Sequence, residues 1–375
     1  MKILFFSSYF YPYTSGITTY PLKILNFLSK NNQVTVLTFL HNKKLKQEEK
    51  INRLKIIRIP YLIKISKGFI SPQSLFHFFR EIKKTDLIII NIPNFEGLLL
   101  AILGKLFTKK IVCIFHCQVF LSKGLLNRIV EFFLNLSISL QLSLSNKIIA
   151  YTKDYFMSLK LYRRFIKKTI FTLSPIDQLK IDNEVIDKYL SLKKNCIWIG
   201  YAGRVAREKG LEYLIEAFSK LKIVNKELVF AGPFGKDVSG EEKYYLEMNK
   251  LLHEKKIKYR FLGNLETDQL GSFYKSIDVM VLPSINQTEA FGMVQAEAMV
   301  CGTPVVTSNL PGVRAPIQLT KMGIIVQPKN PQQLEKAILT ILKNKSRFSN
   351  DKLIDHAKNV FNIKKVYEFY TNLIK

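Results

Sequence analysis

The sequence predicts an α/β protein with two doubly wound parallel sheets, and three observations support this fold class. The chain has 375 residues, more than one mixed α/β core usually holds, so two domains are expected. Short, near-continuously apolar runs recur along it, as in parallel strands that are buried on both faces. The segments between the runs are mostly long enough for helical crossovers, which predicts two Rossmann-like domains.

The apolar runs fall into two series with a polar segment between them. The first series is residues 2–8, 33–39, 54–60, 86–92, 110–115 and 147–152, and the second is 197–203, 227–232, 259–263, 278–283, 303–308 and 322–327. Pro175 and the polar stretch to Asn195 predict the interdomain connection, because proline disfavours helix in the residue before it. We predict an N-terminal domain at 1–178, a C-terminal domain at 179–355, and a C-terminal helix at 356–375 that packs back toward the first domain. Ligands of such sheets bind at the carboxyl ends of the strands, so a substrate is expected in a central cleft that both domains face.

The composition and the apolar segments indicate in which cellular compartment the protein works. The four cysteines lie in or beside apolar runs without a pair of CxxC motifs, which fits a reducing environment better than a disulfide framework. The first residues lack the apolar core and cleavage site of a signal peptide. The best candidate for a membrane span, 132–146, is interrupted by polar residues and falls short of the ~20 residues a spanning helix needs. We therefore predict a cytoplasmic protein.

The chain is strongly basic, with 57 Lys and Arg against 29 Asp and Glu and a formal net charge of +28. Such a charge attracts nucleic acid, anionic lipid or phosphorylated small molecules. A compositional bias spread over solvated faces explains the excess equally well. Bases cluster at 43–67 and 160–168 and alternate with aromatics at 75–84, which predicts that the N-terminal domain docks on the anionic inner face of the plasma membrane as a peripheral protein. The alternative is that these aromatics are core residues surrounded by solvated bases.

Two glutamates in one stretch are candidate binding residues. Glu289 follows the strand that ends at Pro283, and Glu297 lies inside a helix expected from Gly292 to about Cys301. A carboxylate at a strand end can hold sugar hydroxyls, and one on the helix can accept both hydroxyls of a ribose. By spacing alone, two such glutamates are more often solvated than functional.

A glycine-rich turn carries candidate cations. Gly203, Arg204, Lys209 and Gly210 follow the strand at 197–203 and precede an amphipathic helix that starts at Leu211. Glycine permits close backbone approach, and two cations beside a helix N-terminus can neutralise a diphosphate. The alternative is that these bases are merely exposed.

The N-terminal domain offers His116, which follows the strand at 110–115, and the loop that ends at Gly16. A lone histidine is more often structural than catalytic. This loop is not a dinucleotide fingerprint, and the sequence has no GxxxxGK[ST] phosphate loop, so NAD binding and P-loop chemistry lose their support. No DxD pair occurs to hold a metal on a diphosphate. We predict no metal and no cofactor.

In combination, these residues resemble glycosyltransferase family 4, retaining GT-B enzymes of the "glycosyl transferases group 1" type, over nearly the whole chain. The most specific stretches are residues 203–210 and 278–306. The resemblance implies a GT-B fold and a metal-independent, retaining hexosyltransferase that uses a UDP- or GDP-sugar. The acceptor would be a glycan or lipid-linked molecule in cell-surface polysaccharide or glycolipid assembly.

The resemblance also implies roles for single residues. Arg204 and Lys209 would hold the donor diphosphate, Glu297 the ribose and Glu289 the transferred sugar, and His116 would lie beside that sugar. The catalytic residues would be Glu289, His116, Arg204 and Lys209. The donor-binding set would be Gly16, Gly203, Arg204, Lys209, Glu289, Phe291, Gly292 and Glu297. The family usually has a Gly-Gly pair where this chain has Ser15-Gly16, and the glutamate frequent after Gly312 is Val313 here.

Three alternatives stay open. Another GT-B activity, a nucleotide-sugar epimerase or a phosphorylase, shares the fold. A basic protein that binds nucleic acid or a membrane without catalysis would explain the charge, although no nucleic-acid-binding motif accompanies it; we expect no nucleic-acid partner. A catalytically silent nucleotide-binding subunit is the third.

Overall fold

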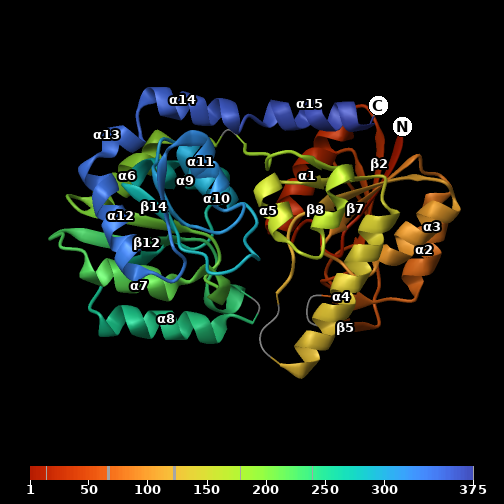
Figure 1. The fold of residues 1–375 in the computed structure, drawn as a ribbon, viewed down its shortest axis with the longest axis horizontal. Coiled ribbons are helices and arrows are strands. Elements are labelled where there is room, and N and C mark those ends of the chain that lie inside the picture. The colour runs from red at the N-terminus through yellow and green to blue at the C-terminus, as the bar shows by residue number, and fades with distance from the viewer. Residues whose placement is uncertain (14, 66–67, 121–123, 178, 239, 375) are drawn as a thin grey trace. The chain divides into compact units, whose positions relative to one another are not determined.

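The chain folds into two units, which Figure 1 shows in a colour ramp along the sequence. The computed structural model describes residues 1–13, 15–65, 68–120, 124–177, 179–238 and 240–374. The first unit holds Met1–Pro175 with Ile363–Lys375, and the second holds Ile176–Asn362. The chain therefore divides at 175/176 where the sequence predicted 178/179, and the returning segment starts at Ile363 where residue 356 was predicted.

The first unit is built on a sheet whose described strands have the order β10-β9-β8-β7-β1-β2-β4-β3. Neighbouring strands are parallel except β3, which is antiparallel to β4. A separate hairpin pairs β5 with β6. The bounds are β1 Lys2–Phe6, β2 Gln33–Phe39, β3 Glu48–Ile51, β4 Leu54–Ile59, β5 Ile63–Ile65, β6 Gly68–Ile70, β7 Leu87–Ile92, β8 Lys110–Phe115, β9 Lys147–Ala150 and β10 Thr169–Phe171.

Helices cover both faces of this sheet. They are α1 Gly16–Leu28, α2 Gln73–Ile82, α3 Gly97–Leu106, α4 Leu125–Leu144, α5 Lys153–Ser158, the 3₁₀ turn η1 Arg163–Lys168, and α15 Ile363–Ile374. The chain reaches β7, β8 and β9 in one direction across the sheet, so right-handed crossovers put α2, α3 and α4 on one face. The first crossover, from β1 to β2, runs in the opposite direction across the sheet, which puts α1 on the other face.

The returning helix α15 packs on α1 inside the first unit. The rings of Phe27 and Tyr367 stack with their centroids 4.1 Å apart. The buried hydroxyls of Tyr20 and Tyr370 share a hydrogen bond of 2.8 Å. Aromatic packing and one buried hydrogen bond therefore hold the C-terminal segment on the first unit.

The second unit is built on a sheet whose described strands run in the order β13-β12-β11-β14-β15-β16, all parallel. The bounds are β11 Ile197–Ala202, β12 Lys226–Ala231, β13 Tyr259–Phe261, β14 Val279–Leu282, β15 Val305–Ser308 and β16 Gly323–Val326. Its helices are α6 Asn183–Lys193, η2 Arg207–Lys209, α7 Leu211–Lys220, η3 Gly235–Asp237, α8 Glu242–Glu254, α9 Thr267–Ser276, α10 Met293–Val300, α11 Ala315–Thr320, α12 Pro331–Lys343, α13 Lys345–Phe348 and α14 Asp351–Val360.

The predicted fold class is confirmed, with one difference. Every apolar run forms a strand close to its predicted bounds, and β7 is buried at each position, as a strand covered on both faces should be. The polar stretch before Asn195 is not simply a connection: Asp182 caps α6, which packs on α9. The candidate span lies in α4, and over the described residues no helix is both long and apolar enough to cross a membrane.

Candidate functional site

The second unit gathers charged side chains where two neighbouring strands end. Strands β11 and β14 pair in parallel, so the loops after them leave the same edge of the sheet. The Ile285 N–H donates to the Glu208 carbonyl at 3.0 Å. Gly210 has φ 63°, and a Cβ there would lie 2.8 Å from the Pro283 carbonyl oxygen. These two contacts fix the glycine-rich turn against the loop that carries Glu289.

Two ion pairs result from this arrangement. The Lys209 ammonium contacts the Glu289 carboxylate, and each of these side chains is 16% exposed. The Arg204 guanidinium pairs with Glu208 at 2.8 Å and is 38% exposed. Residues 80 positions apart in the sequence thus place a cation and a carboxylate together at the carboxyl edge of the sheet.

Close backbone packing between the loops after β11 and β12 supports the glycine-rich turn. Gly203 and Gly232 follow β11 and β12 with φ 134° and 129°. A Cβ on Gly232 would lie 2.3 Å from the Gly203 carbonyl oxygen, so a larger residue there would force the two loops apart. The buried Tyr201 hydroxyl donates to the Arg204 carbonyl at 2.7 Å, which anchors the residue that carries the guanidinium.

Helix α10 positions the second glutamate. Gly292, at φ 74°, is its N-cap, as the sequence predicted for the start of the helix. The Tyr274 hydroxyl on α9 donates to the Glu297 carboxylate at 3.0 Å. Burial and the Glu297 charge raise the pKa of Tyr274 well above its usual value, so this hydroxyl stays a donor. Glu297 is therefore held by a neutral partner.

The loop before α10 is tied to the loop after β15. The buried Gln295 amide donates to the Phe291 carbonyl at 2.9 Å and to the Val313 carbonyl at 2.7 Å. Phe291 itself is buried and packs its ring toward Phe361. Phe291 therefore supports the loop with its side chain inside the unit.

His116 lies inside the first unit and is 2% exposed. The Asn91 amide nitrogen donates to the Ser7 hydroxyl at 3.0 Å and the Ile17 carbonyl at 3.1 Å, which turns its oxygen toward His116. That oxygen accepts from Nε2 at 2.6 Å, so Nδ1 accepts from the Tyr151 hydroxyl. Burial lowers the pKa of His116 to about 3, so the ring is neutral at pH 7. Both ring nitrogens are engaged within this unit.

The same network reaches the loop that carries Gly16. Gly16 is exposed and begins α1, and the carbonyl of its neighbour Ile17 accepts from Asn91. His116 and Gly16 thus belong to one neighbourhood at the carboxyl edge of the first sheet. The other predicted residues lie in the second unit.

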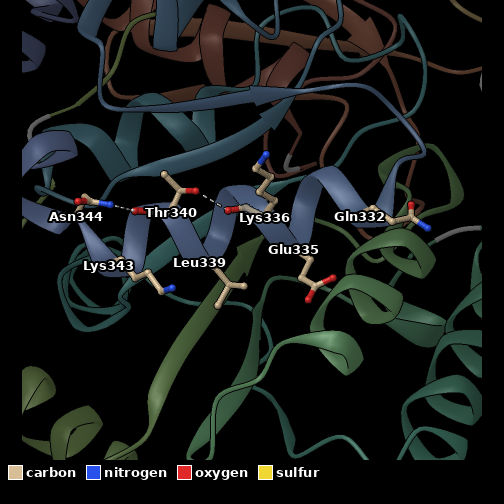
Figure 2. Close-up of a pocket in the computed structure, with 7 residues that line it drawn as sticks. All are labelled: Gln332, Glu335, Lys336, Leu339, Thr340, Lys343 and Asn344. Carbon is tan, nitrogen blue, oxygen red and sulfur yellow. Dashed lines mark hydrogen bonds between the residues drawn. The ribbon is translucent and has the colours of Figure 1, made fainter.

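A surface hollow on α12 contains none of the predicted residues (Figure 2). Its walls come from Gln332, Glu335, Lys336, Leu339, Thr340, Lys343 and Asn344. Along the helix, Thr340 donates to the Lys336 carbonyl at 2.7 Å and Asn344 to the Thr340 carbonyl at 3.0 Å. The lining follows one helix and its end, without the convergent polar groups of a ligand site.

The family model described as "Glycosyl transferases group 1" matches residues 182–360. Residues 182–360 are therefore similar to group 1 glycosyltransferases. The group 1 part of the predicted resemblance is confirmed. The charged cluster at the ends of β11 and β14 and all of α10 lie within these residues.

The chain has relatives among curated proteins. It is similar to "Uncharacterized glycosyltransferase MJ1607" of Methanocaldococcus jannaschii, 37% identical over 174 residues, which cover 46% of this chain and 40% of the relative. A "D-inositol 3-phosphate glycosyltransferase" of Corynebacterium urealyticum is 33% identical over 153 residues, which cover 39% of this chain and 35% of that protein. Each match spans less than half of the relative.

Solved structures extend the likeness of fold to both units. The Anabaena protein Alr3699/HepE, solved in complex with UDP and glucose, has a TM-score of 0.79 at 19% identity, covering 100% of this chain and 99% of that chain. At this identity the likeness establishes the fold alone. The GT-B fold predicted from the sequence is thereby confirmed.

Three positioning residues escaped the sequence analysis. Tyr274 holds Glu297, and Asn91 and Tyr151 hold His116. Asn91 carries a signal, because it is a polar residue inside the apolar run of β7. Tyr151 follows β9 as His116 follows β8. Tyr274 has no such mark in the sequence.

The neutral state of His116 predicts a pH-dependent stability. Its folded pKa lies below the ordinary histidine value of 6.5, so between about pH 3 and 6.5 the unfolded chain binds a proton that the folded chain does not. Unfolding should become easier as pH falls, by up to ~1.4 kcal/mol per pH unit. Urea unfolding at pH 7 and pH 5 should show a larger loss for the wild type than for His116→Gln, which keeps one donor and one acceptor. Equal losses would contradict the buried neutral histidine.

Proposed function

We propose that this chain is a retaining glycosyltransferase that moves a sugar from a nucleoside diphosphate sugar to a glycan or lipid-linked acceptor without a metal ion. The observation that carries the proposal is the Lys209–Glu289 pair beside Arg204, at the carboxyl ends of adjacent strands in the region similar to group 1 glycosyltransferases. The acceptor would belong to cell-surface polysaccharide or glycolipid assembly, on the inner face of the plasma membrane. The first unit would bind it.

The charges suit a diphosphate leaving group. Lys209 and Arg204 would contact the two phosphates, where negative charge grows as the bond to the sugar breaks. Preorganised cations stabilise such a transition state most strongly when they are partly withdrawn from water, as Lys209 is. The carboxylate of Glu289 holds the Lys209 ammonium in place until the donor arrives and would then contact the hydroxyls of the transferred sugar.

Glu297 suits the ribose of the donor. Its carboxylate can accept hydrogen bonds from two neighbouring hydroxyls, and Tyr274 orients it without competing for its charge. In the proposed reaction the acceptor oxygen bonds to the anomeric carbon on the side from which the nucleotide leaves. The carbon–phosphate oxygen bond breaks, and the acceptor proton passes to the departing phosphate oxygen. No enzyme nucleophile is required.

A donor screen tests the function directly. UDP-, GDP- and ADP-sugars should be compared for thermal stabilisation and for slow release of nucleotide, with and without EDTA. One class of donor at ~100 Kd should add ~2.7 kcal/mol, and EDTA should leave both signals unchanged. A loss that Mn²⁺ restores would refute metal independence, and conversion of the donor sugar without nucleotide release would indicate an epimerase.

Removal of one cation should affect rate more than folding. Lys209→Ala should lower turnover ~10²- to 10³-fold, because it removes charge from the leaving group. Lys220→Ala is the matched control, since Lys220 lies at the end of α7, half exposed and paired with Glu216. Its turnover should match the wild type. If Lys209→Ala lost turnover only in proportion to a lower melting temperature, Lys209 would be a structural residue.

Substitutions of the two glutamates should affect the binding of different ligands. Glu297→Gln should weaken binding of the nucleoside diphosphate and of the nucleotide sugar alike, by ~10-fold or more. The reason is that the ribose hydroxyls lose a charged hydrogen-bond acceptor. Glu289→Gln should leave nucleoside diphosphate binding unchanged or tighter, since Lys209 loses its competing carboxylate, while turnover falls. Titration calorimetry with the nucleotide distinguishes them. Wild-type nucleotide affinity in Glu297→Gln would overturn its assignment.

A further inference from the structure

Helix α4 differs from a surface helix of a soluble domain, because it exposes large apolar side chains while it also buries Ile138 and Leu142. Its outer positions are apolar, with Leu125 77%, Phe132 64% and Phe133 53% exposed. Its inner positions include Ser137 and Gln141, which are 2% and 0% exposed. A helix on a soluble domain normally turns its apolar stripe inward.

The buried polar side chains of α4 have specific partners. Ser137 donates to the Phe95 carbonyl at 2.8 Å, and the Gln141 amide donates to the Asn94 carbonyl at 2.9 Å. These bonds fix the rotation of the helix about its own axis. The apolar stripe is therefore held outward by the structure and does not result from a loosely placed helix.

The outward stripe is continuous along the helix. It contains Leu125, Leu126, Ile129, Phe132, Phe133, Leu136 and Leu140, at the three- and four-residue spacing of one helix face. From first to last it extends about 22 Å at 1.5 Å per residue.

The neighbouring helices enlarge this surface. Helix α3 packs against both α2 and α4, and all three lie on one face of the sheet. On α3, Ile102 and Leu106 are exposed, and on α2, Leu75, Phe76 and Phe79 are exposed. We call the exposed apolar residues of these three helices the α2–α4 face. It holds twelve exposed apolar side chains on helices that pack against one another, whereas an ordinary surface exposes such residues singly.

Basic residues lie beside the α2–α4 face at the end of α2 and next to α4. Between residues 97 and 176 the sequence has twelve Lys and Arg against two acidic residues. The Lys83 ammonium lies 4.0 Å from the Phe79 ring centroid. Next to α4, the Tyr162 hydroxyl donates to Asn135 at 2.6 Å, which holds the segment of exposed bases Lys160, Arg163, Arg164 and Lys167 against the helix.

We propose that the α2–α4 face docks on an anionic bilayer, with its apolar side chains at the acyl boundary and the adjacent bases at lipid phosphates. The charge selects this occupant over a second copy of the chain. A two-fold dimer would set the same face against itself and bring its bases into mutual repulsion. The proposal deepens the proposed function, which presents the acceptor at a membrane, but it rests on the face alone.

This surface keeps the segments 75–84 and 160–168 that the sequence favoured, but it adds α4 and leaves out 43–67. Within 43–67, Arg58 is 1% exposed and pairs with Glu49 inside the first unit. Lys55 lies 4.0 Å from Glu48 across the β3–β4 pair, so part of that basic segment is already neutralised. The aromatic segment 75–84 is divided, with Phe78 buried and Phe76 and Phe79 exposed.

Vesicle flotation of the full chain tests the proposal. Vesicles of phosphatidylcholine with 30% phosphatidylglycerol should bind the wild type, and vesicles of phosphatidylcholine alone should bind it much less. Binding should weaken from 0.1 M to 1 M salt, as the screening length falls from about 10 Å to about 3 Å. The double variant Phe132→Ser with Phe133→Ser should bind at least ~10-fold less, because two exposed aromatic side chains that would enter the lipid are removed.

Matched variants separate lipid contact from general effects. Val224→Ser with Leu246→Ser removes two exposed apolar residues from the second unit, 97% and 58% exposed, and should float like the wild type. Arg163→Gln with Arg164→Gln should reduce binding only to anionic vesicles. If the phenylalanine variant misfolded by circular dichroism, Leu125→Ser with Leu126→Ser would replace it, with the same expected loss.

The outcomes distinguish this proposal from the proposed function. Vesicle binding that the α2–α4 face variants abolish supports the docking surface even if no nucleotide sugar binds. If the protein bound a donor but did not float with anionic vesicles, the proposed docking surface would be wrong and the proposed glycosyltransferase function would stand. Flotation unchanged in both α4 variants would also overturn it, as would lipid-free dimerisation that the same substitutions abolish in analytical ultracentrifugation.

Discussion

The close contact between two loops of the second unit is the constraint on which the candidate site depends. Strands β11 and β14 are neighbours in the sheet, but sheet pairing alone would only bring their loops to the same edge. Gly210 lets the first loop approach the second at a distance that a side chain would prevent. The Ile285–Glu208 backbone bond then sets the register in which Lys209 reaches Glu289. A glycine thus determines where a charge lies.

The first unit shows the same dependence of position on buried polar bonds, with a different result. Asn91 is turned by Ser7 and Ile17, and its oxygen in turn fixes the tautomer of His116. On α4, buried Ser137 and Gln141 fix the rotation of a helix whose outer face is apolar. In both places a few buried hydrogen bonds orient the side chains around them, because a polar donor left unpaired in the interior would cost free energy.

The sequence predicted the elements whose pattern is local. The buried parallel strands were found because each is an uninterrupted apolar run, and Glu289 and the two cations were placed in loops because they follow such runs. Strand β3, with the sequence EEKI, was missed because it is a half-exposed edge strand without that pattern. Helix α6 was missed because it is polar around most of its circumference. Tyr274 and Tyr151 were missed because their roles depend on long-range contacts that no local spacing reveals.

The carboxyl edges of the two sheets carry different kinds of polar group. In the second unit the edge holds alternating charges, with Lys209 on Glu289 and Arg204 on Glu208. In the first unit the edge around His116 is neutral, because burial keeps the imidazole uncharged between an amide oxygen and a hydroxyl. The cations of the second unit suit a diphosphate, and its carboxylates suit the hydroxyls of a sugar and a ribose. The neutral edge of the first unit has no cation in this network to attract a diphosphate, which supports our proposal that the second unit binds the donor.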